Sequence, residues 1–211
     1  MRAGVILCGG TSTRFGETDK ASRLLAGKPL VRHVADRLFP VIDEVVVSCR
    51  REQTDTLEDA LVGYDRPVRF AYDERADAGP LHGIGRALSE TDATYVVVVA
   101  CDMPFVDPSF VRHLFETAEE RDGAIPRTDD GWYQPLLAVY RSPAVLTAIR
   151  RASRMGVDRP IEAVQSLDYV VVADDDLESV TDDWTFFNVN TPEDLERARN
   201  RLRSVSPSEK P

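Results

Sequence analysis

The stretch with the clearest chemical potential is LCGGTSTRFGETDK, residues 7–20, which follows a short apolar run. Its two consecutive glycines, Gly9 and Gly10, let main-chain N–H groups approach a ligand without a clash from Cβ, and such groups suit anionic oxygens. Arg14 and Lys20 add positive charge to the same loop, and only three of the 26 basic residues of the chain are lysines. We therefore interpret this stretch as a phosphate-binding loop with Arg14 and Lys20 as its cations.

Two well-known phosphate loops do not fit this stretch. A Walker A loop needs a Lys directly after its second glycine, but Gly16 is followed by Glu17, and Lys20 comes later. The dinucleotide fingerprint G-x-G-x-x-G needs three glycines at a spacing that Gly9, Gly10 and Gly16 do not have. An ordinary strand-to-helix turn with a solvated basic rim stays open, because a glycine pair is a weak signal.

A second chemical candidate is Asp102, which follows an almost wholly apolar run at residues 95–100. An aspartate at this place could simply cap the next helix. Asp107 suits that cap better, because Pro108 directly after it suits the first helical position. Asp102, at the mouth of a buried strand, then needs another role. The simplest role is to hold a metal ion that bridges to a triphosphate.

The cysteines and one histidine are weaker candidates. Cys8, Cys49 and Cys101 each follow an apolar run and show no paired spacing, which predicts buried, reduced thiols rather than a metal site. His82 opens a predicted helix, where a lone histidine is more often a packed or solvent-facing residue than a catalyst.

Positioning these residues requires strands and helices, and the chain alternates short apolar runs with helical periodicity. Strands are predicted at residues 4–7, 44–48, 68–72, 95–100 and 169–172, with a bent strand-like segment at 131–141. Helices are predicted at residues 30–39, 52–61, 81–90 and 108–121. This alternation predicts a three-layer, Rossmann-like α/β fold with a mainly parallel central sheet. The ligand of such a sheet lies beyond the carboxyl ends of the strands.

Length and composition set further bounds. With 211 residues and 43% hydrophobic content, we expect a single domain at residues 1–203 and a disordered polar tail at 204–211. No apolar run is long enough to cross a membrane and no secretion signal is present, so a cytoplasmic protein is expected. The net charge of −10 disfavours nucleic acid and anionic membranes as partners. Acidic excess with so few lysines also suggests a halophilic protein, as a hypothesis.

The string at residues 7–20, followed by GKPL at 27–30, resembles the signature of the molybdenum cofactor guanylyltransferases. It departs at Cys8, where the family usually has Ala, and at Phe15, where it usually has Met. Neither departure removes a charge or a glycine. Further strings that resemble the family follow in family order, namely GPLHG at 79–83, CDMP at 101–104, QPLLAVY at 134–140 and NVNTPEDL at 188–195. The wider nucleotidyltransferase superfamily shares the Gly-Gly, Arg and Lys elements, so the first string alone identifies the superfamily better than the family.

The resemblance implies a site for GTP and Mg²⁺. Asp102 would be the magnesium ligand and would form the catalytic set with Arg14 and Lys20. The backbone of residues 7–9 and the carboxylate of Asp73 would face the guanosine. The complete set of implied nucleotide contacts is Leu7, Cys8, Gly9, Gly10, Lys20, Asp73, Gly79, Pro80, Leu81 and Asp102. Two further positions depart from the family, because Arg50 stands where the family is usually Asn-rich and His82 stands where it usually has Ala.

The second half of the chain offers candidates for the second substrate. Gln134 belongs to a string that, by resemblance, leads toward that substrate, and the neighbouring Trp132 and Tyr133 could stack on a pterin or pack in the core. Arg154 and Arg159 could hold the terminal phosphate of molybdopterin, because Arg suits bidentate phosphate contacts. A solvated helix face is the open alternative for the whole group of Arg150, Arg151, Arg154 and Arg159.

The closing string NVNTPEDL adds two amides. Thr191 can cap the last helix, with Pro192 at its first position and Asp194 reaching back. Capping by Thr191 leaves Asn188 and Asn190 free. By resemblance, Asn190 could complete the metal shell or orient the pterin substrate, and Asn188 is a further pterin candidate.

Taken in order, these strings predict a molybdenum cofactor guanylyltransferase, which makes the guanine dinucleotide form of molybdopterin and pyrophosphate from GTP and molybdopterin cofactor. The pterin phosphate would attack the α-phosphorus of GTP, and the enzyme would position two anions and neutralise the leaving pyrophosphate. Molybdenum cofactor synthesis proteins and acceptor molybdoenzymes are possible partners. A related enzyme could instead use CTP or another phosphorylated acceptor, such as a sugar phosphate or adenosylcobinamide phosphate. A non-catalytic nucleotide-binding protein is the alternative from a different class.

Overall fold

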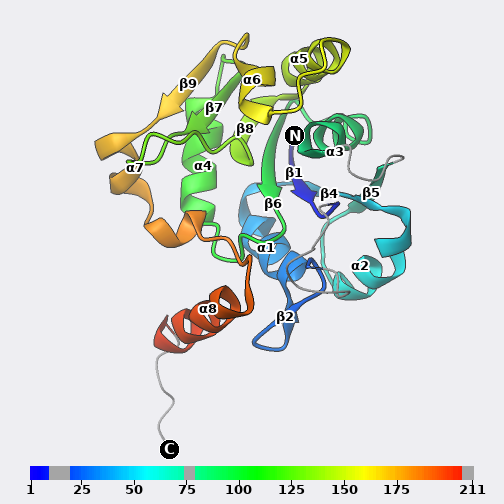
Figure 1. Cartoon of the computed structure of the whole chain (residues 1–211), viewed down its shortest axis with the longest axis vertical. Helices are drawn as coiled ribbons and strands as arrows, with labels where there is room; N and C mark the ends of the chain where they lie inside the picture. Colours follow the sequence, from blue (N-terminus) through cyan, green and yellow to red (C-terminus); the bar gives the residue numbers. More distant parts are fainter. Residues whose placement is uncertain (10–19, 74–78, 206–211) are drawn as a thin grey trace, which may run out of the picture.

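The structure is a computed structural model that describes residues 1–9, 20–73 and 79–205. A seven-stranded sheet lies between two layers of helices (Figure 1). Along the sheet the strands are β5 (Val68–Asp73), β4 (Glu44–Arg50), β1 (Arg2–Leu7), β6 (Tyr95–Ala100), β8 (Leu137–Arg141), β7 (Gly123–Pro126) and β9 (Tyr169–Val172). A small separate hairpin joins β2 (Leu24–Leu25) to β3 (Lys28–Pro29).

Strand β1 lies at the centre of a parallel block. It pairs in parallel with β4 and β6, and β4 pairs in parallel with β5. Strand β8 is antiparallel to both β6 and β7, whereas β7 and β9 are parallel to each other. Figure 1 shows β4 and β5 on one side of β1, and β7 and β9 on the other. The carboxyl ends of β1, β4, β5 and β6 therefore meet at one edge of the sheet.

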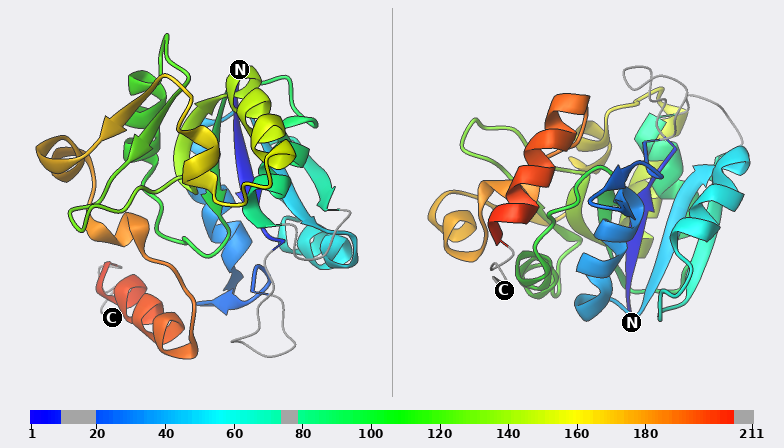
Figure 2. Two further views of the ribbon diagram at one scale, coloured as in Figure 1. Left: turned by 45° about the horizontal axis from the view of Figure 1, so that its top comes forward. Right: turned by 90° about the horizontal axis from the view of Figure 1, so that it is seen from below.

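Helices cover both faces of the sheet. One face carries α3 (Gly79–Leu88), α5 (Ser142–Arg154) and α6 (Pro160–Val164), which contact one another and are seen together in Figure 2. The other face carries α1 (Leu30–Leu38), α2 (Thr54–Ala60), α4 (Pro108–Thr117) and α7 (Asp174–Val180). Short 3₁₀ helices occur at η1 (Phe39–Val41), η2 (Arg51–Gln53) and η3 (Asp183–Phe186).

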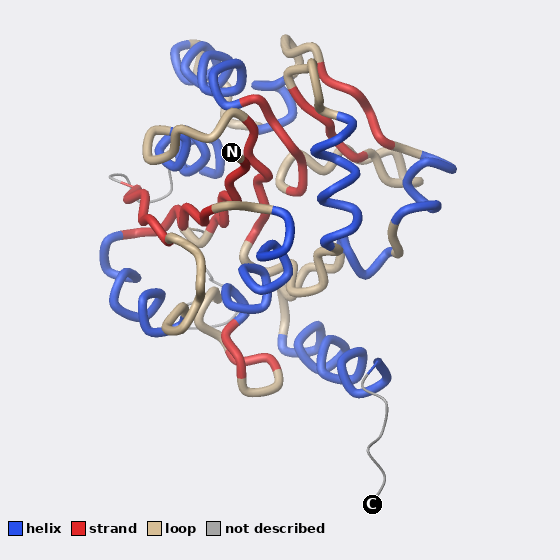
Figure 3. Tube along the Cα trace, turned by 180° about the vertical axis from the view of Figure 1, so that it is seen from behind, coloured by secondary structure: helices blue, strands red, loops and turns tan. Residues whose placement is uncertain are grey.

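Each face of the sheet has its own hydrophobic core. Val97 and Val99 of β6 face the α1 side, and Val96 and Val98 face the α3 side. Their full burial confirms that β6 is covered on both faces, as its apolar run predicts. A third, smaller core lies under α8 (Pro192–Val205), beside the β2–β3 hairpin, and Figure 3 shows these two elements at the same end of the molecule.

The sequence predictions for the parallel block are confirmed. All five predicted strands are present with ends within two residues of those expected, and α1, α2, α3 and α4 occupy the four predicted helical segments. The segment at 131–141 is a strand only from Leu137 onward. Strand β7 is not among the predicted strands, and strict alternation fails at β8, which returns antiparallel because a loop rather than a helix joins β7 to it.

The last helix reaches further than the sequence suggests. Helix α8 continues to Val205, two residues into the segment where we expected a disordered tail, and residues 206–211 lie outside the described part of the chain. Within the described ranges, no helix is both long and apolar enough to cross a membrane.

Candidate active site

The candidate site lies where the direction of strand succession reverses. From β1 the chain adds β4 and then β5 on one side, and then crosses to add β6 on the other. In open α/β sheets this switch point, beyond the carboxyl ends of the strands, is the usual place for a ligand. The segments that follow β1 and β6 carry Lys20 and Asp102, so both main catalytic candidates belong to this point.

Lys20, Asp102 and Asn190 meet there. The Lys20 ammonium donates to Oδ2 of Asp102 and, over 2.6 Å, to Oδ1 of Asn190. These partners are 82 and 170 residues away from Lys20 in the chain. The side chains of Lys20 and Asp102 keep only 17% and 14% of their exposure, so the pair is largely shielded from water. The fold therefore brings Lys20, the end of β6 and the closing string together at one charged centre.

Backbone hydrogen bonds fix this centre. The carbonyl of Asp102 accepts from the N–H of Val189 over 2.9 Å, which ties the closing string to the end of β6. The N–H of Cys101 donates to the carbonyl of Leu7 over 3.1 Å and thereby extends the β1–β6 pairing into the site. These two backbone hydrogen bonds help to position Asp102 and Asn190.

Capping is performed by the residues predicted for it. The side chain of Asp107 accepts from the N–H of Ser109 over 2.7 Å, so Asp102 is not needed at the start of α4. At α8, Thr191 accepts from the N–H of Asp194 over 3.1 Å, and Asp194 accepts from the N–H groups of Thr191 and Asn190. This reciprocal cap leaves the Asn190 side chain available to Lys20.

A close approach requires glycine at the end of β1. A Cβ atom on Gly9 would lie 2.5 Å from Oδ2 of Asp73, which reaches over the end of β4 toward β1. The preceding Cys8 is held by its N–H, which donates to the carbonyl of Ser48 over 2.7 Å. Gly10 and Arg14, the other predicted members of this loop, lie outside the described residues.

Gln53 supports the same turn and was missed by the sequence reasoning. Its side chain is almost fully buried, donates to the carbonyl of Cys8 over 3.1 Å, and accepts from the N–H of Arg50 over 2.7 Å. Gln53 thus couples the ends of β1 and β4. Its position shortly after a predicted strand is the only sequence signal for this role. A glutamine at such a position is equally typical of the protein surface. Arg50 itself lies 3.1 Å from the exposed carboxylate of Glu52.

Three buried polar atoms at the mouth of the sheet have no hydrogen-bond partner. They are Oδ1 of Asp73, Nε2 of His82 and Oδ1 of Asp102, and outside arginine side chains they are the only such atoms among the described residues. Burial raises the pKa of the Asp73 carboxyl, and the charges of His82 and Arg86 oppose that rise. Unsatisfied buried groups are costly and usually have a reason, which here is consistent with a ligand that supplies the partners.

The other predicted nucleotide contacts start α3. Gly79 opens this helix with a positive φ of +77°, which favours glycine, and Pro80 follows. Leu81 is buried in the core on the α3 side, so its side chain packs rather than faces solvent. Leu7 also packs against that core, from the end of β1.

The candidates for the second substrate have local partners. Gln134, in the β7–β8 connection, donates to Oγ1 of Thr128 over 3.2 Å, and Asn188 donates to the carbonyl of Phe186 over 2.9 Å. Trp132, beside Gln134, keeps 64% of its exposure, so it does not pack in the core, whereas Tyr133 packs against the core on the α3 side.

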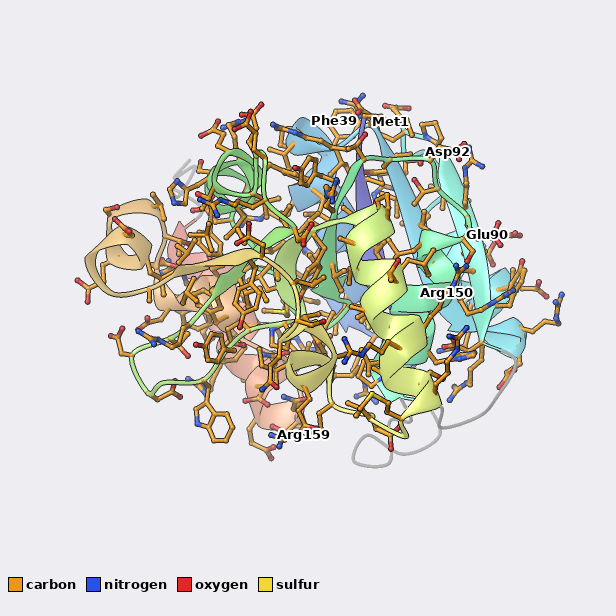
Figure 4. All side chains as sticks on the ribbon, turned by 90° about the horizontal axis from the view of Figure 1, so that it is seen from above. Met1, Phe39, Glu90, Asp92, Arg150 and Arg159 are labelled. Carbon is orange, nitrogen blue, oxygen red and sulfur yellow. The ribbon has the colours of Figure 1, made fainter. Side chains whose placement is uncertain are left out.

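Arg150 and Arg159, two of the four clustered arginines, lie in different parts of the molecule. Figure 4 shows Arg150 on the flank of the molecule. Arg159 lies at the end opposite Met1, and β1 terminates at this same end as Arg159. Arg159 lies 2.9 Å from Glu162, and Arg154, at the end of α5, is exposed. The solvated helix face therefore describes Arg150 well, whereas Arg159 lies toward the mouth.

The oxygen atoms at the centre suit magnesium. Asp102 offers a carboxylate whose Oδ1 is unpartnered, and the amide oxygen of Asn190 shares the Lys20 ammonium with Oδ2 of Asp102. Hard oxygen ligands of this kind, few in number and completed by phosphate oxygens and water, are typical of Mg²⁺ sites. Among the described residues, no group of three or more His, Cys, Asp or Glu side chains could hold a metal. The three cysteines are buried and form no disulfide, as predicted.

Comparison with known proteins decides the family. A family model for the MobA-like NTP transferase domain matches residues 4–164. The chain belongs to this family. Membership makes the protein a nucleotidyltransferase enzyme and confirms the resemblance drawn from the five strings. The mainly parallel three-layer architecture is confirmed as well.

Relatives within the family are similar over nearly their whole length. A probable molybdenum cofactor guanylyltransferase of Natronomonas pharaonis is 45% identical over 95% of this chain and 98% of its own. One of Haloferax mediterranei is 36% identical over 95% and 94%. The crystal structure of molybdopterin-guanine dinucleotide biosynthesis protein A from Archaeoglobus fulgidus has a TM-score of 0.78 at 31% identity and covers 97% of this chain and all of that one.

Proposed function

We propose that the protein transfers GMP from GTP to the terminal phosphate of molybdopterin cofactor and releases pyrophosphate. The convergence of Lys20, Asp102 and Asn190 beside the glycine turn of β1 carries this proposal, because it places a cation and oxygen ligands where a triphosphate would lie. The names of relatives that match over nearly the whole chain support both substrates.

The chemistry needs no covalent intermediate on the protein. An oxygen of the pterin phosphate is already anionic at neutral pH and attacks the α-phosphorus, while the bond from that phosphorus to the pyrophosphate oxygen breaks. The protein's contribution is to align the two phosphates and to neutralise the charge that builds on the leaving group. Lys20 supplies part of that charge, and Arg14, outside the described residues, is proposed to share the task.

Asp102 and Asn190 are the residues that would hold Mg²⁺. When bound, this ion supplies electrostatic stabilisation to the triphosphate oxygens. Lys20 occupies the space between the same two side chains, so its ammonium is positioned to contact whatever anion binds there.

The guanosine is assigned to the β5 side of the mouth. Asp73 is proposed to face the base, and the backbone of residues 7–9, together with Gly10 and the start of α3 at Gly79 and Pro80, is proposed to border the nucleotide. The lack of a Cβ at Gly9 supports this assignment, because it lets the Asp73 carboxylate approach the end of β1.

The pterin is assigned to the opposite side. The β7–β8 connection lies at the mouth, because the N–H of Ala100 at the end of β6 donates to the carbonyl of Leu136 over 3.2 Å. Gln134, Asn188 and Asn190 are the proposed contacts, with Arg154 and Arg159 for the terminal phosphate.

The cellular setting follows from the same proposal. We infer a cytoplasmic enzyme of one domain that works with molybdenum cofactor synthesis proteins and acceptor molybdoenzymes, and not with nucleic acid or membranes. A net charge of −10 with few lysines supports a halophilic origin. Equal activity and melting temperature in dilute and molar KCl would contradict that origin.

Pyrophosphate release tests the function. Purified protein with Mg²⁺ and molybdopterin cofactor is given GTP, CTP or ATP in parallel reactions, with a reaction without pterin as control. Release with GTP alone, dependent on the pterin, is the expected result. Preference for CTP would favour the cytidylyl alternative, and binding of nucleotide without any release would favour the non-catalytic alternative.

A further inference from the structure

Two of the unpartnered atoms at the mouth lie together on its β5 side. Asp73 ends β5, and its buried Oδ1 has no hydrogen-bond partner. His82 lies in the first turns of α3, and its buried Nε2 has none either. Ser48 of β4, against which the start of α3 packs, is paired with Ala71, two residues before Asp73, so both atoms belong to the same end of the sheet. The charge of His82 also opposes the rise that burial causes in the pKa of the Asp73 carboxyl. The proposed function gives the imidazole no role.

Packing holds His82 and Asp73 at the same end of the sheet. Helix α3 packs against β5, β4 and β1, and Leu81 and Ile84, on either side of His82, are buried in the core. A Cβ atom on Gly83 would lie 2.6 Å from Oγ of Ser48, so α3 sits directly on the end of β4. On the other side, Gly9 confines Oδ2 of Asp73. His82 and Asp73 are therefore held by packed elements at the same end of the sheet.

The two residues present an acceptor and a donor at the same end of the sheet. A carboxylate only accepts hydrogen bonds, and an imidazole nitrogen that carries a hydrogen donates one. Guanine offers the complementary edge, because its N1–H and 2-amino group donate while its neighbouring O6 accepts. A carboxylate can take both donors at once, whereas cytosine and adenine offer one amino group beside a ring acceptor and would leave one carboxylate oxygen unpaired.

We propose that His82 reads the nucleobase, donating from Nε2 to O6 of guanine while Asp73 accepts from N1–H and the 2-amino group. This inference rests on the proposed function and names the residue that distinguishes guanine within that site. His82 is a departure from the residue expected at this position, so the contact would be a feature of this chain. A site built to hydrogen-bond a substrate group rejects an analogue that lacks it, because its polar atoms are left unpaired.

Calorimetric titration tests the assignment. GTP and the triphosphate of 2-aminopurine riboside, which lacks both O6 and the N1 hydrogen, are titrated with Mg²⁺ into wild-type protein and into His82→Ala. We expect His82→Ala to weaken GTP binding by about fivefold to tenfold, the effect of one lost hydrogen bond. The O6-free analogue should bind more weakly to wild type and change by less than about twofold in the variant, because it has no O6 for Nε2 to contact.

Two further variants keep the test sharp. His82→Gln retains a donor and should recover part of the GTP affinity. His113→Ala removes a half-buried histidine from α4, on the other face of the sheet, and should leave the GTP affinity unchanged. Thermal melts establish that each variant is folded. Equal losses for GTP and the analogue, or no loss for GTP, would overturn the role of His82. If the wild-type protein did not bind GTP at all, the proposed function itself would fail.

Discussion

The two sides of the mouth are built differently. On the nucleotide side, the functional side chains contact partners far away in sequence, as Lys20 does with Asp102 and Asn190, and Gln53 with Cys8. On the pterin side, Gln134, Asn188 and Arg159 contact residues within six positions of themselves. Long-range contacts tie a residue to the whole fold, whereas local contacts can adjust with one loop. We therefore expect substitutions to have large effects on the first side and small effects on the second.

The largest effect is expected for Asp102→Ala. The loss removes a ligand of the proposed metal site and the partner of the Lys20 ammonium, so the rate of pyrophosphate release should fall by at least about two to three orders of magnitude. Asp168→Ala is the matched control, because it removes a surface carboxylate that pairs only with Arg121 among the described residues and should alter the rate by less than about twofold. Normal turnover with Mg²⁺ in Asp102→Ala would remove this residue from the mechanism.

Lys20→Met should come next. It keeps the length of the side chain but removes the charge, so we expect kcat/KM for GTP to fall by roughly 10- to 100-fold. Lys28→Met is the control, because that lysine forms an exposed ion pair with Asp36 and should have almost no effect on turnover. Steady-state kinetics on both variants decides the matter, and wild-type values for Lys20→Met would reject the phosphate-binding role.

Gln53→Leu tests whether a buried positioning residue with long-range contacts also has a large effect when it is substituted. The change leaves the Cys8 carbonyl and the Arg50 N–H without their side-chain partner, so the free energy of unfolding should drop by about 1–3 kcal/mol. Because Gln53 shapes the β1 turn without touching a reacting atom, we expect KM for GTP to rise by about tenfold while kcat changes little. Urea denaturation and kinetics give the two numbers. A fall in kcat at constant KM would contradict a purely positioning role.

The same contrast explains what could be read from the sequence. The parallel block follows from apolar runs and their spacing, and Asp102, Lys20 and the Asp107 cap are each predicted from position relative to a strand or helix end. The meeting of Lys20 with Asn190 is not visible in the sequence, because nothing local indicates which loops the fold brings together across 170 residues. Gln53 and the antiparallel β8 were missed for the same reason, since burial and strand direction depend on tertiary packing.

Asp73→Asn should have a smaller effect, which raises the melting temperature of the free protein but lowers the protection that GTP gives. Burial raises the pKa of Asp73 above its ordinary value of 3.8, so the folded state binds more protons and wild-type stability falls as pH rises through the interval between 3.8 and the raised value. The neutral amide lacks this penalty. Above that interval we expect Asp73→Asn to melt about 1–2 °C higher than wild type, a modest gain because the carboxyl is only about half buried.

Melting curves across pH, with and without GTP, check this prediction. The gain should disappear below pH 3.8, where the carboxyl is protonated in both states, and GTP should protect the variant less than wild type because one proposed contact to the base is weakened. A variant that melts lower than wild type at neutral pH would show that the ionised carboxylate contributes to stability.

The smallest effect is expected on the pterin side, where two exposed arginines form a matched pair. Arg159→Gln removes a charge that lies toward the mouth and should raise KM for molybdopterin cofactor by about two- to threefold, with GTP binding unchanged. Arg150→Gln removes the same charge from the flank and should change neither value, because its distance from the mouth leaves it screened by solvent. Kinetics at varied pterin concentration separates the two. A rise of tenfold or more in KM for molybdopterin cofactor in Arg159→Gln would contradict the difference between the two sides. It would mean that a side chain with only local contacts binds its substrate as firmly as the Lys20 centre binds the nucleotide.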